Sequence, residues 1–169
     1  QSFKQFAPDW SPRGDAIAYE GAESGGVASD VVSSIWIADL GAGGIATPRR
    51  LTDPAALPGC ASMPTFQPNG QGLAYTYVPP GGTTVFLRWI DWAGHGDGQL
   101  GTLGSVDNFH RRLRWTPDGT RIYVSLANQG DKVFWIPSSG GAFTADNTIN
   151  MPTKNFDFHP GTGRVALET

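Results

Sequence analysis

Residues 115–124 read Trp-Thr-Pro-Asp-Gly-Thr-Arg-Ile-Tyr-Val, and the same pattern occurs three more times in the chain. Each copy contains an aromatic residue, one variable residue, a proline, a glycine-containing turn and a strand of alternating apolar side chains. Proline has no N–H for a β-ladder, and Asn-Gly or Asp-Gly readily forms the tight turn of a hairpin. The pattern therefore predicts four β-hairpins, at residues 10–19, 66–75, 115–124 and 158–167.

The spacing of these hairpins indicates a larger repeated unit. Their marker prolines, Pro12, Pro68, Pro117 and Pro160, are 56, 49 and 43 residues apart, and two further strand-like segments lie between successive markers. Four strands per unit, named A to D in chain order, fit this spacing. The chain therefore holds three units of four strands and a last unit that has strands A and B only.

The repeat fixes the expected secondary structure and core. No window combines helical periodicity with capping residues, so we expect helix in less than about a tenth of the residues. The four marker aromatics hold equivalent positions, and we expect them to be buried between neighbouring units except where a neighbour is missing: Trp10, Phe66, Trp115 and Phe158. We expect fourteen strands, near residues 4–10, 15–20, 34–40, 48–52, 63–67, 72–78, 84–91, 99–103, 109–116, 121–127, 132–137, 142–145, 154–159 and 163–168.

The composition of the 169 residues agrees with an all-β protein. Hydrophobic residues make up 39% and charged residues 16%, and Gly (23) and Pro (13) together exceed a fifth of the chain, which suits short strands and tight turns. The net charge of −3 gives no reason to expect nucleic acid as a partner, and no apolar run approaches the ~20 residues of a membrane-spanning helix. Cys60 is the single cysteine, which excludes an intrachain disulfide, and we expect it to be a small buried residue or an inert thiol.

The first unit carries a series of short motifs. These are Trp-Ser-Pro at 10–12, Ile-Ala-Tyr at 17–19, the strand 35–40, Gly-Gly at 43–44 and Arg-Arg-Leu-Thr at 49–52. The series closely resembles the WD40-like (PD40) repeat of the TolB-type β-propellers, and the likeness extends over essentially the whole chain. The resemblance implies about six to eight blades of roughly 40–50 residues around a central channel, with strand A innermost.

We therefore interpret the chain as part of a larger all-β propeller. It comprises blade 1 (residues 1–55), blade 2 (56–105), blade 3 (106–148) and half of blade 4 (149–169). Blade faces at the two ends of such a segment have no neighbour, so we expect the isolated chain to self-associate.

The densest group of charged residues is the candidate site for a ligand or partner. It consists of His110, Arg111, Arg112 and Arg114, on a strand that we expect to be an inner one. Three interpretations stand: a salt-bridged or solvated patch near the channel, a site for an anionic or peptide ligand, and a nucleic-acid surface of stacked aromatics and arginines. The acidic net charge disfavours the third.

Two functions from different classes are compatible with the sequence. The first is a non-catalytic scaffold that binds a protein or peptide through its loops and channel mouth, since blade faces are used in packing. The alternative is an accessory propeller domain of a larger hydrolase, such as a prolyl-oligopeptidase-like peptidase, whose catalytic domain lies outside this chain. A propeller enzyme acting on sugars or lactones is a third hypothesis, which requires converging acids or a channel metal.

No catalytic residue, cofactor or metal ligand is assigned from the sequence. The chain has no P-loop and no Gly-x-Ser-x-Gly motif, and its three histidines have no spacing typical of a zinc site. The resemblance implies a bacterial protein in a periplasmic or extracellular location.

Overall fold

The computed structural model describes residues 4–24, 31–41, 43–44, 46–106, 110–126, 130–149, 151–153 and 155–168. These residues contain no helix and form fourteen strands. The strands are β1 (Lys4–Trp10), β2 (Ala16–Ser24), β3 (Val31–Leu40), β4 (Ala46–Arg50), β5 (Cys60–Phe66), β6 (Gly72–Val78), β7 (Thr84–Asp91), β8 (Gly98–Ser105), β9 (His110–Trp115), β10 (Arg121–Leu126), β11 (Lys132–Pro137), β12 (Thr144–Ala145), β13 (Asn155–Phe158) and β14 (Val165–Glu168). The predicted all-β class is confirmed, and the first and last residue of each strand lie within four residues of the predicted bounds.

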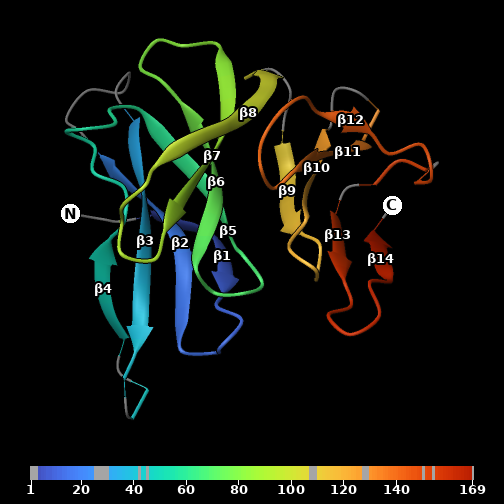
Figure 1. Cartoon of the computed structure of the whole chain (residues 1–169). Coiled ribbons are helices and arrows are strands. Elements are labelled where there is room, and N and C mark those ends of the chain that lie inside the picture. The colour runs from blue at the N-terminus through green and yellow to red at the C-terminus, as the bar shows by residue number, and fades with distance from the viewer. Residues whose placement is uncertain are drawn as a thin grey trace.

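The first twelve strands form three antiparallel groups of four in chain order, and the last two strands form a hairpin (Figure 1). We name them blade 1 (β1–β4), blade 2 (β5–β8), blade 3 (β9–β12) and half-blade 4 (β13 and β14). Among the described residues one parallel pair, Ser33 with Cys60, joins blades 1 and 2 into one eight-stranded sheet. The residue numbers at which one blade ends and the next begins remain a prediction from the sequence.

The first strand of each blade contacts the first strand of the next. Contacts join β1 to β5, β5 to β9 and β9 to β13, so the four A strands form a continuous series. Successive sheets packed through their first strands are the arrangement of a β-propeller, with the A strands lining the inside. The chain is therefore an open segment of a propeller, with blades 1 and 2 on one side of Figure 1 and the rest on the other.

One turn geometry recurs in the first three A–B hairpins. In blade 3 the Gly119 N–H bonds to the carbonyl of Thr116, and the Thr116 N–H bonds to the carbonyl of Arg121. Proline occupies the second position of this four-residue turn, and Gly119 adopts a φ of +69°. Asn69 and Asp118 do not adopt positive φ, so glycine alone supplies the left-handed residue that the Asn-Gly and Asp-Gly dipeptides predicted.

A β-bulge interrupts each of the first three A strands, two to four residues before the marker aromatic. The register shifts between Phe6 and Asp9 in β1 and between Ser62 and Thr65 in β5. In β9 the partners of Ser125 and Leu126 are Arg112 and His110, so one residue of β9 is skipped. A bulge bends its strand and redirects the side chains beside it.

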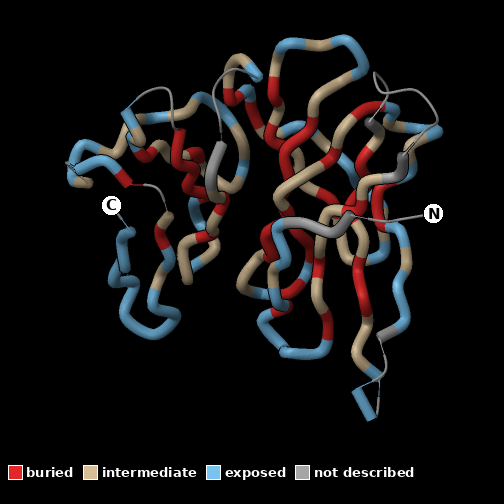
Figure 2. The backbone as a smooth tube through the Cα atoms, turned by 180° about the vertical axis from the view of Figure 1, so that it is seen from behind, coloured by how far each residue is buried: buried red, intermediate tan, exposed pale blue. Residues whose placement is uncertain are grey.

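The marker aromatics pack against the preceding blade. Trp115 is 6% exposed, and its indole N–H bonds to the carbonyl of Thr65 in blade 2 at 3.1 Å. Phe66 is buried in a cluster with residues of blade 1, and the half-buried Phe158 lies 5.1 Å from the Tyr123 ring of blade 3. Buried segments accordingly run along the middle of the strands, while the loops are exposed (Figure 2).

Trp10 differs from the other three, because it is 59% exposed. This is the exception that the sequence prediction allowed: the described chain has no blade before β1 against which Trp10 could pack. Cys60 is half-buried.

Candidate binding site at the inner strands

The four residues predicted as a site lie on β9, the inner strand of blade 3. The side chains of His110 and Arg111 are outside the described part of the structure. Arg112 and Arg114 are two positions apart on the strand, and both point to half-blade 4. Their guanidinium groups meet the carboxylate of Asp157, at 3.6 Å from Arg112 Nη2 and 3.4 Å from Arg114 Nε.

Arg114 also reaches across to blade 1. Its Nη1 lies 3.2 Å from Asp9 Oδ1, so one guanidinium connects the A strands of blade 1 and half-blade 4. The strand registers explain this, because Asp9, Arg114 and Asp157 each stand immediately before the marker aromatic. The Arg114 side chain is 13% exposed, whereas that of Arg112 is 37% exposed.

Asp9 additionally satisfies the backbone of blade 2. Its Oδ2 accepts a hydrogen bond from the Phe66 N–H at 2.8 Å. Burial raises the pKa of Asp9, and the Arg114 charge and the Phe66 bond oppose this only in part. Burial likewise raises the pKa of Glu20, whose carboxylate is bonded by the Met63 N–H. The carboxylates of the two acids thus accept hydrogen bonds from N–H groups of β5. These backbone groups are therefore not left unpaired on the inner side of the sheet.

A small cavity of about 130 Å³ opens beside these residues. It is lined by two bulged segments and by β9: Ala7, Pro8, Met63, Pro64, Arg112, Leu113 and Arg114. The cavity is smaller than the roughly 300 Å³ at which pockets for drug-sized ligands begin, so it suits a single side chain. Sequence reasoning missed the bulges, although Ala7-Pro8 and Met63-Pro64 are matching dipeptides at matching distances before the aromatic.

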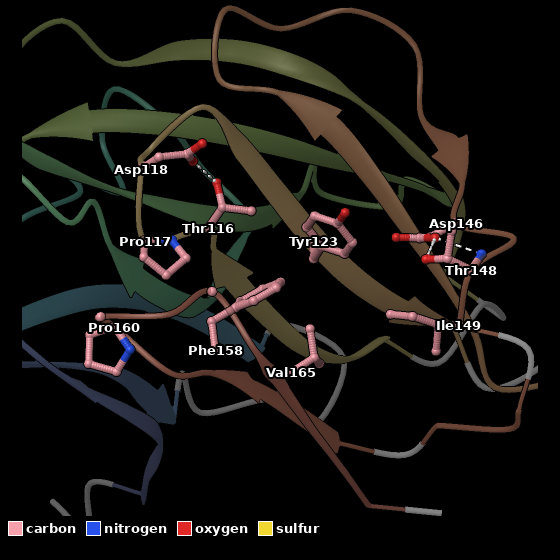
Figure 3. Close-up of a pocket in the computed structure, with 12 residues that line it drawn as sticks. Thr116, Pro117, Asp118, Tyr123, Asp146, Thr148, Ile149, Phe158, Pro160 and Val165 are labelled. Carbon is pink, nitrogen blue, oxygen red and sulfur yellow. Dashed lines mark hydrogen bonds between the residues drawn. The ribbon is translucent and has the colours of Figure 1, made fainter.

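A larger groove lies between blade 3 and the hairpin of half-blade 4 (Figure 3). Its volume is about 560 Å³, and Tyr123 and Phe158 lie on its floor. No signal within one repeat predicts it, because its two walls belong to different blades.

The two histidines outside the candidate site lie in a turn and a loop. The ring of His159 accepts the Gly161 N–H in the last hairpin turn, and His95 is largely exposed in a glycine-rich loop. The described residues contain no group of three or more His, Cys, Asp or Glu that could hold a metal ion. No described helix is long and apolar enough to cross a membrane.

No family model and no curated protein matches this chain. Among solved structures, it is similar to TolB from Acinetobacter baumannii, with a TM-score of 0.68 and 19% identity over 98% of this chain and 37% of that chain. It is similar to acylaminoacyl peptidase from Pyrococcus horikoshii, with a TM-score of 0.60 and 14% identity over 86% of this chain and 25% of that one. The β-propeller domain of the Trilobed protease from Pyrococcus furiosus gives a TM-score of 0.57 and 13% identity, over 87% and 44%.

These similarities show the fold. The chain is a β-propeller segment of the kind found in TolB and in the propellers of peptidases, as the sequence resemblance implied. It spans less than two thirds of each of these proteins.

Proposed function

We propose that this chain is a non-catalytic propeller scaffold that binds a protein or peptide partner through its loops and the mouth of its channel. Arg112 is the residue that carries the proposal. Its side chain borders the small cavity and is 37% exposed, and its ion pair with Asp157 is long, at 3.6 Å. Its buried Nε has no hydrogen-bond partner among the described residues. The exposed part of the Arg112 side chain can pair with a carbonyl or carboxylate of a partner.

Arg114 has a different role in this proposal. Its guanidinium is almost buried and bonds to two carboxylates and to the Leu113 carbonyl. It therefore holds the inner strands together, and it shares the Asp157 carboxylate with Arg112. His110 and Arg111 complete the proposed partner-binding group on the same strand.

Site-specific photo-cross-linking tests the channel mouth. A photoreactive residue is placed at the exposed Pro8, which lines the cavity, and in a matched variant at the exposed Arg13 in the first hairpin turn. We expect a protein adduct in extracts of the source organism from position 8 but not from position 13, and we expect Arg112→Ala to weaken it. An adduct that forms equally from both positions, or that is insensitive to Arg112→Ala, would contradict the proposal, as would the absence of any adduct.

A second candidate function is an accessory propeller domain of a larger hydrolase. The similarity to acylaminoacyl peptidase from Pyrococcus horikoshii supports it. The complete gene discriminates the two: a downstream Gly-x-Ser-x-Gly followed by Asp and His favours the hydrolase, and its absence favours the scaffold. We also propose a bacterial periplasmic or extracellular location, which an export signal upstream in the gene would support and cell fractionation would test.

A further inference from the structure

The groove between blade 3 and half-blade 4 has the size of a ligand-binding site. Its volume of about 560 Å³ lies within the roughly 300–1,000 Å³ typical of ligand pockets. One wall comes from the first turn of blade 3 and from β10, and the other comes from the β13–β14 hairpin (Figure 3). The segment that follows β12 closes one end.

The floor of the groove is apolar and aromatic. The Tyr123 and Phe158 rings meet edge to face at 71°, with 5.1 Å between their centroids. Ile149 and Val165 extend this surface, and Val165 is 36% exposed. The floor can therefore hold an aliphatic or aromatic group, and its packed rings offer a surface that is already formed.

Two carboxylates border this floor, with Tyr123 between them in the view of Figure 3. Asp118 Oδ1 accepts bonds from the Thr116 hydroxyl and from the Thr120 N–H and hydroxyl. The Thr116 bond is the largest of the effects that lower the pKa of Asp118. Burial acts to raise the pKa of Asp146, but hydrogen bonds, first those from Thr148, outweigh it and lower the pKa. Both acids are thus held as anions at neutral pH.

These two charges are not compensated by a cation among the described residues that line the groove, none of which is Lys, Arg or His. Arg121 does not line the groove: its guanidinium stacks over the Trp135 ring at 4.2 Å and is hydrogen-bonded to the Tyr123 hydroxyl, and its charge helps to lower the pKa of Asp118. An anionic ligand would be repelled, and a purely apolar surface, such as Trp10 of a second copy, would bring two charges against apolar atoms without a partner.

We propose that this groove binds a peptide segment in which a lysine or arginine stands next to an apolar residue. The cation pairs with Asp146 or Asp118, the aliphatic stem lies along Tyr123, and the apolar neighbour packs on Phe158 and Val165. The inference rests on the proposed scaffold function, but it concerns a surface separate from the channel mouth.

Two matched probe peptides test the groove, acetyl-Leu-Lys-Phe-amide and acetyl-Leu-Glu-Phe-amide. They are titrated into the ¹⁵N-labelled chain, and the amide signals of groove residues such as Thr148 and Gly163 are followed. We expect the lysine peptide to shift these signals and the glutamate peptide to bind at least fivefold more weakly, the difference that a partly exposed ion pair supplies. Equal binding of the two peptides would overturn the proposal.

Variants of the two groove carboxylates show whether they bind the lysine peptide. Asp146→Asn and Asp118→Asn keep an oxygen that can cap each turn, so both variants should fold, and each should weaken the lysine peptide about three- to fivefold. Asp53→Asn, an exposed turn acid in blade 1, is the matched control and should change nothing. Arg112→Ala should weaken the channel cross-link and leave this binding intact, so the two proposals fail separately. Lysine-peptide binding that survives both groove variants would overturn the inference, as would a groove blocked by a second copy.

Discussion

Asp9 is the side chain on which the inner strands of three blades converge. One oxygen faces Arg114 of blade 3, and the other accepts the Phe66 N–H of blade 2. A buried carboxyl of this kind is expensive to ionise, and its partners offset only part of the cost, which is why its pKa is raised. The packing of the three blades around Asp9 therefore depends on whether its carboxyl group is protonated.

The buried carboxyls predict an unusual pH dependence of stability. Burial raises the pKa of Asp9 and Glu20 above their ordinary values of 3.8 and 4.5. The folded chain then holds these protons more tightly than the unfolded chain, so their stabilisation is complete below the ordinary values and is lost as the pH rises through the folded-state pKa. Asp118 and Asp146, with lowered pKa values, behave in the opposite way and lose stabilisation as the pH falls through theirs.

We therefore expect the free energy of unfolding to increase from pH 7 towards about pH 4.5 and to decrease in stronger acid. Urea denaturation across this range measures the effect. Glu20→Gln should flatten the rise, whereas Asp53→Asn should follow the parent curve. A stability that falls steadily from pH 7 downwards would show that the two buried carboxyls do not dominate.

The two equivalent tryptophans should differ sharply when truncated. Trp115→Ala removes a buried side chain and its hydrogen bond to Thr65, so we expect a loss of about 3–5 kcal/mol. Trp10→Ala removes a side chain that is 59% exposed, and we expect less than about 1 kcal/mol. Denaturant unfolding of the two variants measures the contrast, and similar losses would refute the assignment of Trp115 to a joint between blades.

At the scale of single elements, the strands and hairpins were predictable because local chemistry determines them. A proline at the second position and a left-handed glycine at the fourth fix both the turn and the strand register in blades 1 to 3. The bulges were missed because a bulge is defined by the pairing of two strands, which the residue pattern of one strand does not show. The ion pairs of Arg114 depend on which blades face each other across the interior, and the groove depends on a gap between two blades. Neither is encoded in one repeat.

The bulge in β1 carries backbone strain that a substitution can relieve. Ala7 has a φ of +48° and precedes Pro8, although left-handed backbone is unfavourable for alanine and proline restricts the residue before it to extended conformations. Since Ala7 is exposed, Ala7→Gly should stabilise the chain by about 0.5–1 kcal/mol. Ala55→Gly, at an exposed turn position with ordinary φ, is the control and should be neutral or destabilising. Denaturation midpoints compare them, and a destabilised Ala7→Gly variant would contradict the strain.

At the scale of the whole molecule, the two ends of the series of blades are open. Trp10 is exposed on blade 1, and Val165 and Leu167 are each 36% exposed on half-blade 4. Exposed apolar faces of this kind promote association. We expect the mass of the isolated chain, measured by light scattering, to increase with concentration, and Trp10→Ser to reduce this increase. A monomer that melts cooperatively at all concentrations would show that both faces are closed in another way.

The direction in which the aromatics pack also has a consequence for synthesis. In blades 2 and 3, and in half-blade 4, the marker aromatic packs against a sheet that precedes it in the chain. A ribosome releases the amino-terminal part first, and domains fold as they emerge. When a new hairpin leaves the ribosome, the sheet against which its aromatic residue packs has already been synthesised. This architecture can therefore assemble in the order of translation, one blade after another.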